Sequence, residues 1–130
     1  MNDSTGPTGV ILFAHGARDP SWGEPFRQIA GRLHAQAPDL LLELAFLEFM
    51  QPDLPAAARA LGDRGARHIE IVPLFLGPGG HLRRELPQLA AAITDALPGV
   101  TVGVAPAAGE DDAVIDALAG YALRRAGTPR

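Results

Sequence analysis

The sequence predicts a three-layer α/β/α domain of the flavodoxin-like type, with a four-stranded parallel sheet in the strand order 2-1-3-4. Short apolar runs alternate along the chain with segments of helical periodicity. The first run, residues 10–13, is apolar throughout, as in strands that helices cover on both faces. A chain of 130 residues is also the size of one domain. Right-handed crossovers between parallel strands then favour the stated order.

Four apolar segments predict the strands. They are residues 10–13, residues 40–47, residues 69–76 and the alternating residues Val100, Val102 and Val104. Glu43 interrupts the second segment, and its stem is expected to pack within that strand. The alternation of the last segment is typical of a half-exposed edge strand. The sheet is therefore expected to have its last strand at one edge.

Helical spacing follows each predicted strand. The Ser-x-x-Glu spacing of residues 21–24 is a capping box that predicts the start of the first helix. The second helix is expected after Asp53. The third follows the glycine-rich loop 77–80, with Pro87 in its first turn, where proline fits best. The fourth contains Val114 and the apolar positions spaced after it. The predicted order is βαβαβαβα.

Composition and charge exclude several classes of protein. There is no cysteine, so thiolate metal sites, disulfides and cysteine nucleophiles are excluded. The net charge is −4 and all 11 cationic side chains are arginine, which argues against a nucleic-acid partner. No apolar run is long enough to span a membrane, and the N-terminus does not resemble a secretion signal. We expect a cytoplasmic protein with a flexible tail over residues 1–8 and one domain over residues 9–126.

Three chemically capable side chains follow the predicted strands. His15 ends the first strand, Glu48 lies just beyond the second, and His81 follows the loop after the third. Ligands of open α/β sheets bind outside the carboxyl ends of the strands, so these side chains are expected at one edge of the sheet. Two imidazoles and a carboxylate suit a divalent first-row ion with open coordination positions. An ion that is to be passed on needs such open coordination positions, because a fully closed site would retain it.

Other titratable residues have simpler explanations. His34 lies among polar residues late in the first helix, and His68 opens the third strand at the opposite end from the predicted site. Both are expected to be surface or hydrogen-bonded histidines. Asp111 and Asp112 resemble a second metal cluster, but acidic residues in the first turn of a helix are explained by the helix dipole.

Three segments at the strand ends carry a family resemblance. They are Phe13-Ala14-His15-Gly16-Ala17-Arg18, Ala45-Phe46-Leu47-Glu48, and Pro73-Leu74-Phe75-Leu76 leading into Gly80-His81-Leu82. Together they resemble the CbiX/SirB family of sirohydrochlorin chelatases, over residues 9–120. Two positions depart from the family pattern: Ala17 stands where serine is usual, and Glu85 where aspartate is usual.

The resemblance implies a lyase that inserts a divalent metal into sirohydrochlorin, for cobalamin or sirohaem synthesis. Cobalt is the first expectation, with iron or nickel as alternatives, and the metal is a substrate. No organic cofactor is implied. His15, His81 and Glu48 match the family's metal-binding and catalytic residues. Long members carry two such modules in one chain, so this single module is expected to form a homodimer that gives the macrocycle a second wall.

Sirohydrochlorin carries many carboxylates, so arginine side chains and a flexible loop are expected beside the site. Arg18, Arg83 and Arg84 are the expected guanidinium partners. Gly79 and Gly80 are expected to let the loop before His81 bend around the substrate. Trp22 could stack on the ring, but packing against the first helix explains it better.

Two other functions fit part of the pattern. His15-Gly16 after a buried strand resembles the nucleophile motif of histidine phosphatases, but Ala14 stands where their phosphate-binding arginine belongs. A carrier or sensor that binds metal or tetrapyrrole without turnover would need the same ligands as a chelatase. That alternative stays open at the level of sequence.

Overall fold

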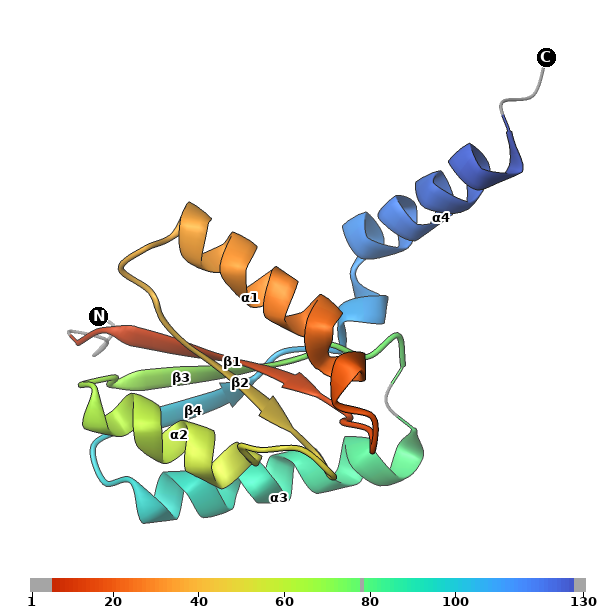
Figure 1. Ribbon diagram of the computed structural model, residues 1–130. Helices are drawn as coiled ribbons and strands as arrows, with labels where there is room; N and C mark the ends of the chain where they lie inside the picture. The colour runs from red at the N-terminus through yellow and green to blue at the C-terminus, as the bar shows by residue number, and fades with distance from the viewer. Residues whose placement is uncertain (1–5, 78, 128–130) are drawn as a thin grey trace.

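The computed structural model describes residues 6–77 and 79–127, apart from the side chain of His81. Four parallel strands form one sheet in the order β2-β1-β3-β4, which confirms the predicted fold and strand order (Figure 1). The strands are β1 (Thr8–Ala14), β2 (Leu41–Phe46), β3 (His68–Pro73) and β4 (Thr101–Val104). The helices are η1 (Pro20–Gly23), α1 (Glu24–Gln36), α2 (Leu54–Asp63), α3 (Gly80–Ala96), η2 (Ala108–Glu110) and α4 (Asp112–Ala126).

The main core lies between the sheet and the pair α2 and α3. Alternate residues of the two central strands point to this face, and Phe13, Ile11, Ile69 and Ile71 are among the most buried side chains. α2 and α3 lie side by side below the sheet, and α1 lies on the opposite face (Figure 1). Each fully buried side chain of this size stabilises the fold by about 1.5–3 kcal/mol. This core holds β1 and β3 rigidly next to each other.

The first helix starts differently from the prediction. Ser21 is not its cap; instead Asp19 caps the 3-10 turn η1, accepting hydrogen bonds from the backbone N–H and hydroxyl of Ser21. α1 then begins at Glu24. A capping-box pattern cannot distinguish a helix from a 3-10 turn that leads into one, since both leave backbone N–H groups to be capped. Trp22 packs on Phe26 of α1, with ring centroids 4.7 Å apart, as expected.

Pro87 lies inside α3 and not in its first turn, so this prediction was wrong. The helix starts as early as Gly80, which places Pro87 in its second turn. Without an N–H, Pro87 cannot donate to the carbonyl oxygen of Arg83. Pro87 is exposed, so water can hydrogen-bond that oxygen in its place.

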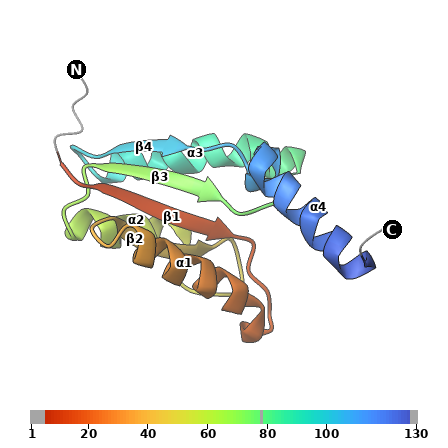
Figure 2. The ribbon, with the colours of Figure 1, turned by 90° about the horizontal axis from the view of Figure 1, so that it is seen from above.

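α4 leaves the body of the domain. In both views it projects beyond the carboxyl ends of the strands (Figures 1 and 2). Its main contacts are with η2, and none of its 15 residues is buried. Helices cover both faces of the sheet, as predicted, but α4 contributes to neither layer.

The ends of the chain are described only in part. Residues 1–5 of the predicted tail lie outside the described residues, and β1 already begins at Thr8. The backbone N–H of Arg67 donates to the carbonyl oxygen of Pro7 at 2.8 Å. Within the described residues, no helix has the length and apolar composition to cross a bilayer.

Candidate metal site at the carboxyl ends of the strands

His15 is the first residue after β1 and is exposed at the carboxyl edge of the sheet. Its ring packs on the ring of Phe75, with centroids 4.5 Å apart and planes inclined by 42°. Phe75 is itself 5% exposed and contacts the ring of Phe13 in the core. One side of the imidazole therefore rests on the rigid core, and the residue stays open to solvent for a ligand.

Glu48 lies directly beside His15. The backbone N–H of Glu48 donates to the carbonyl oxygen of His15 at 3.1 Å, and that of Leu47 donates to Ala14 at 2.9 Å. These bonds continue the pairing of β1 with β2 beyond the strands. Glu48 is exposed, so its carboxylate and the imidazole of His15 occupy the same solvent-facing edge.

Gly16 makes this close approach possible. Its φ is +89°, a conformation that other residues rarely adopt. A Cβ at this position would collide with the carbonyl oxygen of Glu48. The glycine after His15 is thus a requirement of packing the two loops together.

Arg18 reaches the same loop. Its guanidinium lies 4.5 Å from the ring centroid of Phe49, the residue after Glu48. Phe49 has a φ of 69° and is 55% exposed, both unusual for a large apolar residue. The cation–π contact holds Arg18 near Glu48 and leaves it exposed.

The third predicted ligand comes from the start of α3. The backbone of His81 lies in the first turn of this helix, and its side chain lies outside the described residues, as does Pro78 of the preceding loop. The backbone N–H of Leu74 donates to Phe13 at 2.8 Å, so the chain leaving β3 starts beside β1. The structure thus joins His15 to Glu48 and leaves the position of the His81 imidazole undescribed.

The remaining predicted substrate contacts lie around the same helix start. Gly79 and Gly80 are exposed, and a Cβ at Gly79 would meet open space. Arg84 extends back over Gly80, whereas Arg83 lines a cavity of about 210 Å³ toward β4, together with Glu110. Of the three arginines, Arg18 is the one that contacts the loop containing Glu48, through the ring of Phe49.

Other parts of the chain offer no competing site among the described residues. The described residues as a whole, those at the carboxyl edge included, contain no group of three or more histidine, aspartate and glutamate side chains arranged to hold a metal. His68 is hydrogen-bonded to Thr101 at 2.7 Å and to Glu70 at 3.0 Å, and His34 is exposed on α1. Asp111 caps α4 through the backbone N–H groups of Ala113 and Val114, as its position at a helix start predicts.

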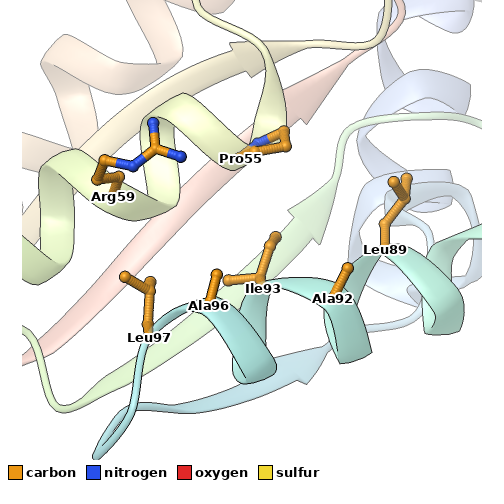
Figure 3. Close-up of a pocket in the computed structure, with 7 residues that line it drawn as sticks. All are labelled: Pro55, Arg59, Leu89, Ala92, Ile93, Ala96 and Leu97. Carbon is orange, nitrogen blue, oxygen red and sulfur yellow. The ribbon is translucent and has the colours of Figure 1, made fainter.

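A small apolar pocket lies away from this edge. It lies between α2 and α3 and has a volume of only about 80 Å³ (Figure 3). Its lining residues are Pro55, Arg59, Leu89, Ala92, Ile93, Ala96 and Leu97. No metal ligand faces it, and its size suits a packing gap between two helices.

Sequence reasoning missed two residues of the site. Phe75 and Phe49 were not among the candidates, yet they support His15 and Arg18. Phe75 follows β3 in the alternation that buries Ile71 and Pro73, which is a signal for burial but not for contact with His15. No pattern in the sequence signals the positive φ of Phe49.

Comparison with known proteins assigns a family to this arrangement. The sequence model of the CbiX family matches residues 9–123. The chain belongs to the CbiX family. A CbiX relative from Sulfurisphaera tokodaii, named sirohydrochlorin cobaltochelatase, is 32% identical over 110 residues, covering 85% of this chain and 87% of the relative. A protein of the same name from Saccharolobus solfataricus is 37% identical, covering 67% of this chain and 66% of that one. The resemblance read from the strand-end segments is confirmed.

Solved structures of CbiX and SirB proteins share the fold. A CbiX protein from Marinobacter aquaeolei superposes with a TM-score of 0.77 at 28% identity, covering 92% of this chain and 99% of that one. SirB from Bacillus subtilis, solved with Fe³⁺, superposes with a TM-score of 0.80 at 23% identity. That match covers 95% of this chain but 48% of SirB, so this CbiX chain spans about half the length of SirB.

Proposed function

We propose that this protein is a sirohydrochlorin chelatase, a lyase that inserts a divalent metal into the tetrapyrrole. The observation that carries the proposal is the pairing of His15 and Glu48 at the carboxyl edge of a CbiX-family sheet. Cobalt is the proposed metal, because the relatives that match most of the chain are named cobaltochelatases. Iron and nickel are the alternatives to be tested, for sirohaem or other tetrapyrrole products.

The metal is held loosely as a substrate. His15 and His81 present nitrogen ligands, and Glu48 presents oxygen, a set that suits Co²⁺, Fe²⁺ or Ni²⁺ while leaving coordination positions open. In the described part of the site both His15 and Glu48 are exposed, so the macrocycle can approach the ion from solvent. The ring nitrogens then replace the protein ligands one after another.

Insertion exchanges two protons for one divalent ion. As the metal enters, both pyrrole N–H groups lose their protons, so the charge of the macrocycle with its metal equals that of the free macrocycle. One imidazole accepts a proton once its nitrogen has released the ion, since a lone pair cannot bind both. Glu48 accepts the other proton or stabilises the resulting imidazolium.

The arginines orient the substrate through its carboxylates. Arg18 is held by Phe49, the residue after Glu48, which keeps a cation next to the site. Arg83, Arg84 and the glycines Gly79 and Gly80 frame the start of α3. The described site is open and one-sided, and a homodimer in the cytoplasm would supply a second wall for the flat macrocycle.

The test is metallation of sirohydrochlorin by the purified protein. The absorbance change is followed without oxygen, with Co²⁺, Fe²⁺ or Ni²⁺ in separate reactions and buffer as the reference. We expect the initial rate with Co²⁺ to exceed that in buffer by at least about 100-fold, a typical contribution of positioned acid–base groups. A rate equal to that in buffer with all three metals would contradict the proposal.

A further inference from the structure

A small polar cluster lies on the face of the sheet that α1 covers only in part. Ile69 and Ile71 of β3 point to the core with α2 and α3. The residues that alternate with them, His68 and Glu70, point to the opposite face. There α1 packs on β1 and β2 (Figure 2). The side chains of His68 and Glu70 are 30% and 37% exposed, so an ion from solvent can reach both.

His68 and Glu70 present a nitrogen and an oxygen ligand side by side. The Nε2 atom of His68 lies 3.0 Å from the Oε1 atom of Glu70. Two neighbouring ligands that are each about 2.1 Å from one octahedral ion also lie about 3.0 Å apart. A turn of the Glu70 carboxylate, with the backbone unchanged, therefore points both atoms at one ion.

Thr101 of β4 fixes the orientation of the imidazole. Its Oγ1 atom lies 2.7 Å from Nδ1 of His68, the ring nitrogen that does not face Glu70. When an ion takes the lone pair of Nε2, the ring proton is on Nδ1, and Oγ1 accepts a hydrogen bond from it. Histidines that bind metals donate their second ring N–H to such a partner, which holds the ring in place. The register that pairs His68 with Thr101 thus supplies the support that a metal ligand needs.

Gly103 leaves room for the carboxylate. It pairs with Glu70 in the register of β3 with β4, and a Cβ at Gly103 would lie 2.7 Å from Oε1 of Glu70. On the other flank, β1 places Thr8 beside His68 and Val10 beside Glu70, and neither is charged. Among the described residues no arginine forms an ion pair with Glu70, so its charge is available to a cation from solvent.

We propose that His68 and Glu70 chelate one divalent first-row metal ion, with Thr101 orienting the imidazole. An imidazole nitrogen and a carboxylate oxygen together suit Co²⁺, Ni²⁺ or Zn²⁺. No third histidine, aspartate or glutamate joins the pair within the described part of the chain, so water completes the coordination and the ion exchanges with solvent. This site goes beyond the proposed chelatase function and does not rest on it.

The site is separate from the edge that contains His15. His68 is in register with Thr8, and Thr8 lies seven residues before His15. At 3.3 Å per residue the two positions are about 23 Å apart. Protein ligands cannot pass an ion directly over that distance. The chain therefore binds a second equivalent of metal that takes no part in insertion.

Calorimetric titration of the untagged protein with Ni²⁺ counts the ions at this site. The His15→Ala/His81→Ala variant removes the imidazoles proposed for the carboxyl edge and leaves His34 and His68 as the histidines of the chain. We expect this variant to bind one Ni²⁺ per chain and to lose that ion when His68→Ala is added. His34→Ala on the same background is the matched control and should retain the ion.

The choice of metal gives a second measurement on the same variant. Ni²⁺ should bind more tightly than Co²⁺, because affinity for nitrogen and oxygen sites rises in that order. Mg²⁺ should bind least, because it prefers oxygen ligands and gives up its water reluctantly. Bound Co²⁺ is paramagnetic, so it should shift or broaden the backbone amide signals of Thr101 and Gly103 in NMR spectra before those of α1.

Thr101→Val tests the orientation of the imidazole without removing a ligand. Valine keeps the shape of the side chain but lacks the oxygen, so the dissociation constant for Ni²⁺ should rise by at least about tenfold. Thr101→Ser keeps a hydroxyl and should restore the affinity. An ion bound loosely to an exposed histidine would respond to neither change.

The outcomes decide the proposal separately from the chelatase function. A Ni²⁺ affinity that is unchanged by His68→Ala or by Thr101→Val would overturn it, provided that circular dichroism shows each variant to be folded. In the otherwise unchanged protein, His68→Ala should insert Co²⁺ at the full rate, and a lower rate would overturn the separation of the two sites. Failure of the chelatase proposal appears instead as metallation no faster than in buffer, which leaves the ion count at His68 unaffected.

Discussion

The backbone N–H of Glu48 lies 3.1 Å from the carbonyl oxygen of His15, so one hydrogen bond joins the loops that follow β1 and β2. It fixes the backbones of His15 and Glu48 side by side at the edge of the sheet, and both residues are exposed there. Phe75 supports the imidazole from the core, and Arg18 on Phe49 adds a cation nearby. These contacts pack the proposed metal site against the core on one side and leave it exposed to solvent on the other.

Removal of the His15 imidazole tests the site most sharply. His15→Ala should lower the rate of cobalt insertion by about 100-fold, because it removes both a nitrogen ligand and a proton acceptor. His81→Ala should act similarly. His34→Ala is the matched control, an exposed histidine on α1, and should retain the full rate. Equal rates for His15→Ala and His34→Ala would refute the role of His15.

The carboxylate of Glu48 is expected to contribute less than the imidazole. Glu48→Gln keeps the size of the side chain and its backbone hydrogen bond but removes the charge, so the rate should fall about tenfold with little change in melting temperature. Asp95→Asn, on exposed α3 surface, controls for the loss of one negative charge. A Glu48→Gln enzyme with the unchanged rate would exclude Glu48 from the mechanism.

Two glycines should respond to alanine in opposite ways. Gly16→Ala forces a side chain into a φ of +89° and against the carbonyl oxygen of Glu48. We expect the free energy of unfolding to fall by about 1–3 kcal/mol. Gly31→Ala, in the exposed middle of α1 with open space around it, should raise it by about 0.5–1 kcal/mol. Urea denaturation measures both, and a neutral Gly16→Ala would contradict the packing described for the two loops.

The cap formed by Asp19 predicts a dependence on pH. Hydrogen bonds first from the backbone N–H and then from the hydroxyl of Ser21 lower the pKa of Asp19 below its ordinary value of 3.8. The stabilisation is therefore fully present above pH 3.8 and is lost as the pH falls through the lowered pKa. Asp19→Ala should melt below the unchanged protein at neutral pH, and the difference should shrink in stronger acid. If the difference in melting temperature between Asp19→Ala and the unchanged protein stays constant into strong acid, the Asp19 cap is not the cause of the stabilisation.

Much of the fold follows from local patterns. Continuous apolar runs and helical spacing predicted four strands, four α-helices and the order 2-1-3-4. The rule that sites lie at the carboxyl ends of parallel strands placed His15 and Glu48 on one edge, and the register of β1 with β2 makes them neighbours. The strand order and the edge at which sites form follow from backbone geometry that is common to parallel α/β sheets, so they can be predicted from sequence patterns.

Other features depend on tertiary contacts that no local pattern contains. The start of α3 at Gly80 puts Pro87 inside the helix, although propensity alone favours its first turn. The contact of Arg18 with Phe49 needs a positive φ at a phenylalanine. The periodicity of α4 shows which of its sides is apolar, but not that the helix leaves its own sheet.

The central claim is that the protein catalyses metal insertion. Multiple turnover tests it most directly, because a carrier or sensor would have the same metal ligands but would not turn over. The protein is supplied at about one hundredth of the concentration of sirohydrochlorin and Co²⁺, and the metallated product is measured over time against buffer. The account predicts many equivalents of cobalt-sirohydrochlorin per chain, formed at an initial rate proportional to protein. Product that stops at one equivalent per chain, or rises no faster than in buffer, would contradict it.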